Sequence, residues 1–136
     1  MRVYVDSSAL IKRAVAEAES HTLEQALDRH VHAGDALVSS TLAWIEISRA
    51  LRARLDGDDH DVVSEAIDDA LSGIAERPIT ADVVSLARRI DPNVLRSLNA
   101  IHLATAVLLD VDTVLTYDDR LAEAARHNGL AVSAPA

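Results

Sequence analysis

The sequence contains no cysteine, so disulfide bonds and thiolate metal sites are excluded. Phenylalanine is also absent, and the aromatic residues are limited to Tyr4, Trp44 and Tyr117. Hydrophobic residues nevertheless make up 49% of the chain. The core must therefore consist of Leu, Val, Ile and Ala side chains. Because Ala and Leu favour helices, this composition favours helices that pack closely.

Long apolar runs are missing as well. No stretch approaches the ~20 apolar residues that a helix needs to cross a bilayer. The N-terminus enters a β-branched segment at once and shows none of the regions of an export signal. We therefore expect a cytoplasmic protein without a membrane segment. The length favours one domain over residues 1–136.

Positive charge is scarce, because 13 Lys and Arg face 22 Asp and Glu and leave a net charge of −9. Taken alone, this balance argues against a nucleic-acid partner, which a basic field would attract. Bound divalent cations would weaken that objection by cancelling acidic charge locally. An acidic chain is also suited to a basic protein partner.

Strand-like segments alternate with helix-like segments along the chain. Apolar, β-branched stretches predict strands at 2–6, 36–39 and 112–116, a strand or connector at 77–79 and an edge strand at 130–132. Apolar periodicity and capping residues predict helices at 9–16, 20–32, 41–55, 61–75, 80–90, 98–109 and 118–127. This alternation implies an α/β fold in which helices cover both faces of a short central parallel sheet of four to five strands.

Four polar residues lie at positions where functional side chains are expected in such a fold. Asp6 ends the first strand, and Asp118 follows the strand at 112–116. Functional groups of open parallel sheets collect beyond the carboxyl ends of the strands. Asn99 opens a helix, and Glu46 lies on a small apolar helix face. Converging carboxylates of this kind hold Mg²⁺ or Mn²⁺, which prefer oxygen ligands, and such ions activate water for phosphodiester hydrolysis.

The segments around these residues, taken in order, resemble the four motifs of the PIN-domain ribonucleases, in particular VapC-type toxins. The first two motifs are similar to Val5-Asp6-Ser7-Ser8-Ala9-Leu10-Ile11-Lys12 and Leu42-Ala43-Trp44-Ile45-Glu46. The last two are similar to the segment from Leu95 to Ala106, which contains Asn99, and to Leu115-Thr116-Tyr117-Asp118-Asp119-Arg120-Leu121. Each motif alone is weak, but their order and spacing cover nearly the whole chain.

The resemblance implies a PIN-like three-layer α/β/α fold and an endoribonuclease toxin that uses Mg²⁺ or Mn²⁺. It also implies cleavage of transfer RNA or ribosomal RNA loops, a homodimer and a cognate VapB-type antitoxin. The catalytic residues carried over are Asp6, Glu46, Asn99 and Asp118, with Asp6, Asn99 and Asp118 at the metal. The resemblance further suggests supporting roles for Ser8 and Thr116, and an uncertain one for Asp119.

Asn99 departs from the family pattern, which has an aspartate at this position. The amide keeps the size of the side chain and one acceptor oxygen, but it loses a negative charge and cannot act as a base. Our hypothesis is that the chain is an attenuated form of the enzyme, either by nature or by engineering. A non-catalytic binding module that captures antitoxin or RNA is the alternative. A phosphotransferase with an aspartyl-phosphate at Asp6 is disfavoured, because Ser8 stands where haloacid-dehalogenase-like phosphatases have a second Asp.

Several of these residues also have a purely structural interpretation. Asp6 and Asp118 are suited to cap helices, and Glu46 is spaced for an ion pair with Arg49. We expect His102, one turn after Asn99, to be a packed and hydrogen-bonded histidine. The apolar stripe that includes Trp44 favours core or subunit interface.

Two surfaces are candidates for partners. Several basic residues are candidates for contacts to phosphate groups, namely Lys12, Arg13, Arg49, Arg52 and Arg96. The helices at 9–16 and 20–32, with the helix of Trp44, carry Leu and Ala side chains suited to an amphipathic antitoxin segment. An Arg of that segment would reach the acidic site and displace the metal.

Overall fold

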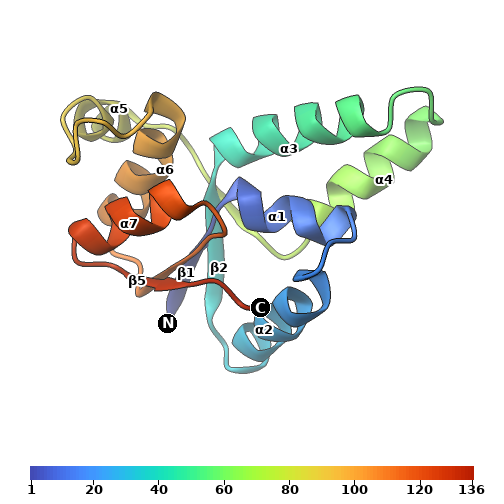
Figure 1. Cartoon of the computed structure of the whole chain (residues 1–136), viewed down its shortest axis with the longest axis horizontal. Helices are drawn as coiled ribbons and strands as arrows, with labels where there is room; N and C mark the ends of the chain where they lie inside the picture. The colour runs from blue at the N-terminus through green and yellow to red at the C-terminus, as the bar shows by residue number, and fades with distance from the viewer.

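The computed structural model describes all residues from Met1 to Ala136 and contains seven helices and five strands (Figure 1). The strands are β1 (Arg2–Val5), β2 (Ala36–Ser40), β3 (Ala75–Arg77), β4 (Thr113–Leu115) and β5 (Ala131–Ser133). The helices are α1 (Ser7–Ala14), α2 (Ser20–His32), α3 (Thr41–Arg54), α4 (His60–Leu71), α5 (Ala81–Ala87), α6 (Ser97–Leu108) and α7 (Asp119–His127).

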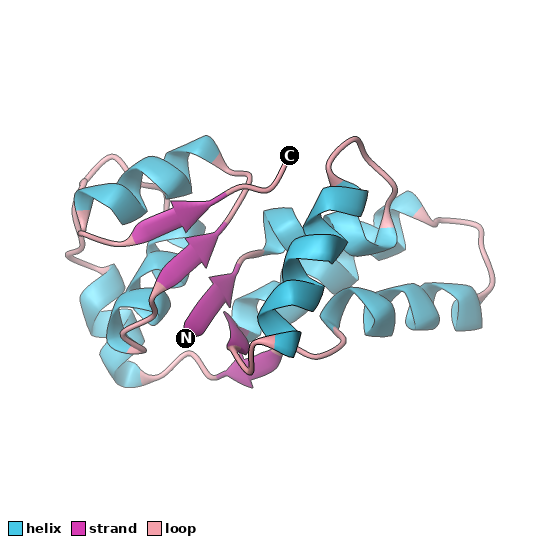
Figure 2. Ribbon diagram, turned by 90° about the horizontal axis from the view of Figure 1, so that it is seen from below, coloured by secondary structure: helices cyan, strands magenta, loops and turns pink.

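The strands form one parallel sheet in the order β3-β2-β1-β4-β5 (Figure 2). The first strand of the chain is thus the central one, and β4, formed more than a hundred residues later, lies directly beside it. The predicted three-layer α/β/α architecture with a parallel sheet of four to five strands is confirmed. No helix has the length and apolar character needed to span a bilayer.

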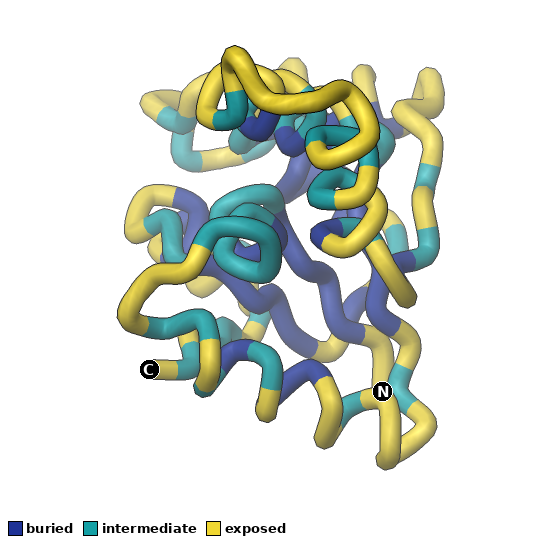
Figure 3. The backbone as a smooth tube through the Cα atoms, turned by 90° about the vertical axis from the view of Figure 1, so that its right-hand side faces the viewer, coloured by how far each residue is buried: buried dark blue, intermediate teal, exposed yellow.

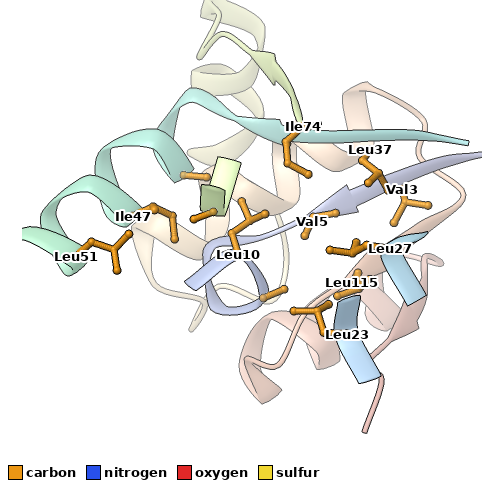
Figure 4. Close-up of a cluster of buried hydrophobic side chains, with 13 residues drawn as sticks. Val3, Val5, Leu10, Leu23, Leu27, Leu37, Ile47, Leu51, Ile74 and Leu115 are labelled. Atoms are coloured by element: carbon orange, nitrogen blue, oxygen red, sulfur yellow. The ribbon is translucent and has the colours of Figure 1, made fainter. Parts of the chain in front are cut away.

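Alternating side chains of β1 point into two separate cores. Val3 and Val5 belong to a cluster of 13 buried residues, which also includes side chains of α1, α2, α3 and α4 (Figure 4). Tyr4 points the other way, into a cluster of nine residues with side chains of α6 and α7. Both faces of β1 are therefore covered, which explains why the strand is apolar from Val3 to Val5 rather than alternating. The buried strands run through the middle of the molecule in Figure 3.

The leucines and alanines expected to form an antitoxin surface lie in the first of these cores. Leu10, Leu23 and Leu27 are 0–2% exposed, and Trp44 packs against the same cluster while partly exposed. The apolar faces of α1 and α2 are thus used by the chain itself. An antitoxin surface built on those leucines is therefore not available.

Several predicted boundaries differ from the structure. The helix expected at 61–75 ends at Leu71, because Gly73 adopts φ +76°, a left-handed conformation that glycine tolerates best. The following strand consequently starts at Ala75, earlier than the predicted 77–79. Helix α5 ends at Ala87 rather than at 90, and a turn follows it before the Asp91–Pro92 bond. Ser97 is the first residue of α6 rather than its cap.

Candidate active site

The pairing of β1 with β4 brings the first and last motifs together. Val5 is in register with Leu115, so Asp6 and Thr116 leave the sheet side by side at its carboxyl edge. The backbone N–H of Asp6 donates to the carbonyl of Leu115 at 3.3 Å. Both Asp6 and Thr116 are buried, with 2% and 1% exposure. The site therefore sits at the end of the two most central strands.

Asp6 is a buried carboxylate that is bound by neutral donors. Ser8 donates its hydroxyl to Oδ1 at 2.7 Å, and Thr116 donates to Oδ2 at 2.9 Å. The N–H of Ala9 also points at Oδ1, at 3.3 Å, as expected for a helix cap. Burial raises the pKa of Asp6, although the nearby His102 and these hydrogen bonds act in the opposite direction. No Lys or Arg side chain hydrogen-bonds or ion-pairs with it.

Asp118 is connected to both Asp6 and Asn99. Its backbone N–H donates to the Thr116 hydroxyl at 3.0 Å, and that hydroxyl donates to Asp6. Oδ1 caps α7 by accepting from the N–H groups of Arg120 and Leu121 at 2.9 and 3.0 Å. Oδ2 accepts from Nδ2 of Asn99 at 3.3 Å. The amide at position 99 thus supplies a donor to a carboxylate, which an aspartate could not do when ionised.

Glu46 joins the site from the other helical layer. Oε1 accepts from Ser7 Oγ at 3.0 Å and lies 2.6 Å from Nε2 of His102. No ion pair with Arg49 forms, so that structural interpretation is wrong. Ser7 is the direct neighbour of Asp6, and Glu46 is therefore connected to the same cluster. Only Oε1 is engaged, which leaves Oε2 without a protein partner.

His102 is the member of the cluster that the motifs did not single out. It is 1% exposed, and its Nδ1 lies 2.6 Å from the hydroxyl of Tyr4. The two rings meet edge to face at 5.8 Å between centroids. This agrees with the expected packed and hydrogen-bonded histidine, but its contact with Glu46 adds a role at the site. The available signals were its position one turn after Asn99 and the place of Tyr4 on the opposite face of β1 from Val3 and Val5.

The remaining candidates lie outside this network. Asp119 is exposed, and its side chain makes no hydrogen bond. Lys12 is paired with Glu17 and Glu19, with its ammonium 4.9 Å from the ring centre of Tyr117. Arg13 is held by Glu24 and by carbonyls at the end of α4. These two basic residues are thus occupied within the chain, whereas Arg49, Arg52 and Arg96 form no ion pair.

The donor set fits a small divalent cation in chemical type. Asp6, Asp118 and Asn99 supply carboxylate and amide oxygens, the ligands that Mg²⁺ and Mn²⁺ prefer. A buried carboxylate whose charge no basic side chain balances is also a suitable neighbour for a cation. No group of three or more His, Cys, Asp or Glu side chains is placed to hold a metal. At position 99 the set contains an amide in place of a carboxylate.

Comparison with known proteins agrees with this geometry. The PIN-domain family matches residues 3–127. Ribonuclease VapC46 of Mycobacterium tuberculosis is 42% identical over 98% of this chain and 97% of its own length. Ribonuclease VapC47 of the same species is 34% identical over 98% and 96%. The chain therefore belongs to the PIN-domain family and, within it, to the VapC type.

Solved structures share the fold at lower identity. VapBC2 from Rickettsia felis, bound to a DNA fragment of its promoter, superposes with a TM-score of 0.77 at 9% identity and covers 98% of both chains. FitAcB from Neisseria gonorrhoeae gives 0.72 at 19% identity, over 98% and 97%. VapC20 of M. tuberculosis, a toxin that cleaves the Sarcin-Ricin loop, gives 0.66 at 18% identity, over 90% and 94%.

Proposed function

We propose that this chain is a metal-dependent endoribonuclease toxin that cuts structured RNA in the cytoplasm and is neutralised by a VapB-type antitoxin. The observation that carries the proposal is one hydrogen-bonded cluster that joins four distant segments of the chain. Its members are Asp6, Glu46, Asn99 and Asp118, with Ser8, Thr116 and His102 between or beside them. The names of the VapC relatives support ribonuclease activity. Loops of transfer or ribosomal RNA suit the substrate, because their unstacked bases are accessible.

In this proposal Asp6, Asn99 and Asp118 hold Mg²⁺ or Mn²⁺. When bound, the ion would supply activation of water and stabilisation of negative charge on the phosphodiester. Ser8 and Thr116 fix both oxygens of Asp6, so the carboxylate is oriented before any ligand arrives. Glu46, whose Oε1 is held by Ser7 and His102, keeps Oε2 available to accept a proton from the attacking water.

We further propose that Asn99 attenuates the enzyme. Its Nδ2 donates to Asp118 Oδ2, so the amide neutralises a carboxylate oxygen that an aspartate would leave for a cation. Restoring the carboxylate would place two acidic groups in contact, and a divalent cation would be needed to stabilise them. The Asn99→Asp variant should therefore bind metal more tightly and cleave RNA faster.

The test is cleavage of total cellular RNA by the unaltered chain and by Asn99→Asp, with Mg²⁺, Mn²⁺ or EDTA. We expect metal-dependent cutting that is at least tenfold faster with Asn99→Asp. Asp119→Asn in the Asn99→Asp background is the matched control, because Asp119 is a neighbouring carboxylate that lies outside the cluster. Equal rates with and without Asn99→Asp would refute attenuation. No cutting by either folded form would refute the ribonuclease proposal.

A non-catalytic binding module remains the second candidate. The observation in its favour is that protein donors occupy oxygens of all three site carboxylates and that no acidic triplet is formed. Such a module would bind RNA or antitoxin equally well with and without divalent metal. Metal-dependent cleavage by the Asn99→Asp form would exclude non-catalytic binding as the ancestral function of the site.

We also propose that the chain binds an antitoxin, because its structural neighbours include VapBC2 from Rickettsia felis, and that it forms a homodimer. A stripe on α6 supports the dimer, because Leu98 and Leu108 are 52% and 48% exposed and Ile101 lies between them. The exposed Val84 of α5 lies beside Ile101 at a shared hollow. Replacing Leu98 and Leu108 by Glu should give a monomer in light scattering; an unchanged dimer would place the interface elsewhere.

A further inference from the structure

A second hollow lies beside the site and is not used by the cluster described above. It measures about 480 Å³ and is lined by the loop before α6 and the first turns of α7. Its lining residues are Pro92, Val94, Leu95, Arg96, Arg120, Glu123 and Ala124. The volume is within the range of about 300–1,000 Å³ that small ligands occupy. The hollow is thus large enough for part of a bound chain.

Two arginines connect this hollow to the active site. Arg96 is the N-cap residue of α6, one turn before Asn99. Arg120 follows Asp118 in α7, and its own N–H donates to Asp118 Oδ1. The two guanidinium groups therefore belong to residues that flank the Asn99–Asp118 contact from both helices. A ligand in the hollow would lie next to that contact.

Neither guanidinium has a partner within the chain. All ion pairs of the protein involve other residues, and no hydrogen bond uses the side chain of Arg96 or Arg120. Both side chains are exposed, so their guanidinium groups are free to contact a ligand. Glu123 is the single acidic residue of the lining, so the hollow carries a net positive charge.

The loop adds an apolar surface to these charges. Val94 is 83% exposed, the most exposed large apolar side chain of the protein. Pro92 and Leu95 line the hollow beside it. A wall of this kind offers a flat apolar contact to an unstacked base, while forked guanidinium groups suit phosphate oxygens. Both features are matched by a single-stranded nucleotide segment.

We infer that this hollow binds the substrate RNA next to the cleavage point, with Arg96 and Arg120 on phosphates and Val94 against a base. The inference rests on the proposed ribonuclease function and adds to it a defined binding subsite. The two arginines give this part of an acidic protein the positive charge that a phosphate backbone needs. An acidic peptide is the alternative ligand that the same two arginines could bind.

The test measures binding of a short, fluorescently labelled single-stranded RNA in EDTA, so that cleavage does not contribute. We compare the unaltered chain with the double variant Arg96→Ala/Arg120→Ala over a range of salt concentrations. Loss of two phosphate contacts should weaken binding about tenfold at low salt. It should also reduce the slope of log K against log salt by about 1.4, since each contact to a single strand contributes about 0.7.

The matched control is Arg54→Ala/Arg126→Ala, which removes two exposed arginines from the C-terminal ends of α3 and α7. This control should bind RNA like the unaltered chain, and Arg96→Lys/Arg120→Lys should recover part of the affinity. If both double-alanine variants lose the same RNA affinity, the effect comes from overall charge alone, and the inference is overturned. Unchanged binding by Arg96→Ala/Arg120→Ala would overturn it as well.

Two further experiments distinguish RNA binding in the hollow from binding of an acidic peptide and from the ribonuclease proposal itself. If the double variant loses binding to poly-glutamate but keeps RNA affinity, the hollow is a protein site and the inference is wrong. Cleavage assays in the Asn99→Asp background test the proposed function separately. Metal-dependent cutting that the double variant retains at full kcat/KM would leave the ribonuclease proposal intact and refute the subsite.

Discussion

Nε2 of His102 lies 2.6 Å from Oε1 of Glu46, and this contact links helices that belong to different cores of the molecule. The backbone N–H of Ser40 donates to the Tyr4 oxygen, and the Tyr4 hydroxyl then donates to Nδ1 of His102. Burial raises the pKa of Tyr4, so this phenol stays protonated and able to donate. With Nδ1 facing the Tyr4 hydroxyl, Nε2 is the ring nitrogen that donates to Glu46.

Replacing His102 by Ala should release Glu46 and slow RNA cleavage. In the Asn99→Asp background we expect kcat to fall about 10- to 100-fold with little change in KM, as for other residues that orient a reacting group. His102→Gln should recover part of the rate, because its amide N–H can occupy the place of Nε2–H. His127→Ala is the control, since His127 is exposed at the end of α7. An unaffected kcat in His102→Ala would show that Glu46 needs no support.

Replacing Asp6 by Asn should stabilise the metal-free protein. Burial raises the pKa of Asp6, which means that the folded state disfavours its charge; the resulting penalty grows as pH rises above the ordinary pKa and is present at neutral pH. Removing the charge should increase the free energy of unfolding by about 1 kcal/mol, or the melting temperature by roughly 2–4 °C.

The same variant should abolish any stabilisation by Mn²⁺ in thermal melts. Asp119→Asn provides the comparison, because it removes an exposed carboxylate and should change neither property. A destabilised Asp6→Asn protein would instead indicate that the hydrogen bonds of the carboxylate outweigh its desolvation.

The N-terminal ammonium should stabilise the fold only in a middle range of pH. The ammonium donates to the carboxylate of Asp35 at 2.7 Å. The same carboxylate also contacts Nδ1 of His30 at 2.8 Å. The hydrogen bond from the ammonium, followed by that from His30, lowers the pKa of Asp35, so this contribution is lost as pH falls through that depressed pKa. The bond to Asp35 raises the pKa of the ammonium, and the contribution is lost again as pH rises through the raised value.

Melting curves of untagged protein and Asp35→Asn should therefore differ most between about pH 5 and pH 8 and converge at both extremes. Asp28→Asn, on the exposed side of α2, should melt like the unaltered chain at every pH. A difference for Asp35→Asn that does not vary with pH would contradict the ionic origin of the effect.

The turn at Gly73 should tolerate an added side chain only with strain. Its φ is +76°, and no atom lies within 4 Å of the position of a Cβ, so the penalty comes from the backbone alone. Gly73→Ala should lower the free energy of unfolding by about 1 kcal/mol in urea titrations. Gly73→Asn should lose less, because Asn visits this conformation more readily. Equal stability of the Ala variant would show that the turn can rearrange.

Much of the fold is predictable because short signals agree with the global arrangement. Apolar stretches at β1, β2 and β4 and capping residues such as Asp6 and Thr80 mark most boundaries correctly. The exception at Gly73 is instructive. Ile74 continues the apolar period of α4, but it is buried after the chain has turned, so periodicity alone extends the helix too far.

The site is less predictable than the fold, for a geometric reason. Asp6 and Asp118 follow adjacent strands, so their proximity depends only on the strand order. The contacts of Glu46 with His102, and of Asn99 with Asp118, depend on how helices rotate and cross, which spacing along the chain does not encode. The role of Arg120 is likewise visible only after the hollow beside α6 is formed.

The central place of β1 has a consequence for the synthesis of the protein. β1 is the first strand to leave the ribosome, but its neighbour β4 is made more than a hundred residues later and completes the site. Until then Asp6 has no Thr116 beside it, and a nascent chain carries no assembled cluster. Contacts of such long sequence separation also form slowly. The assembled site therefore exists only after nearly the whole chain has been made.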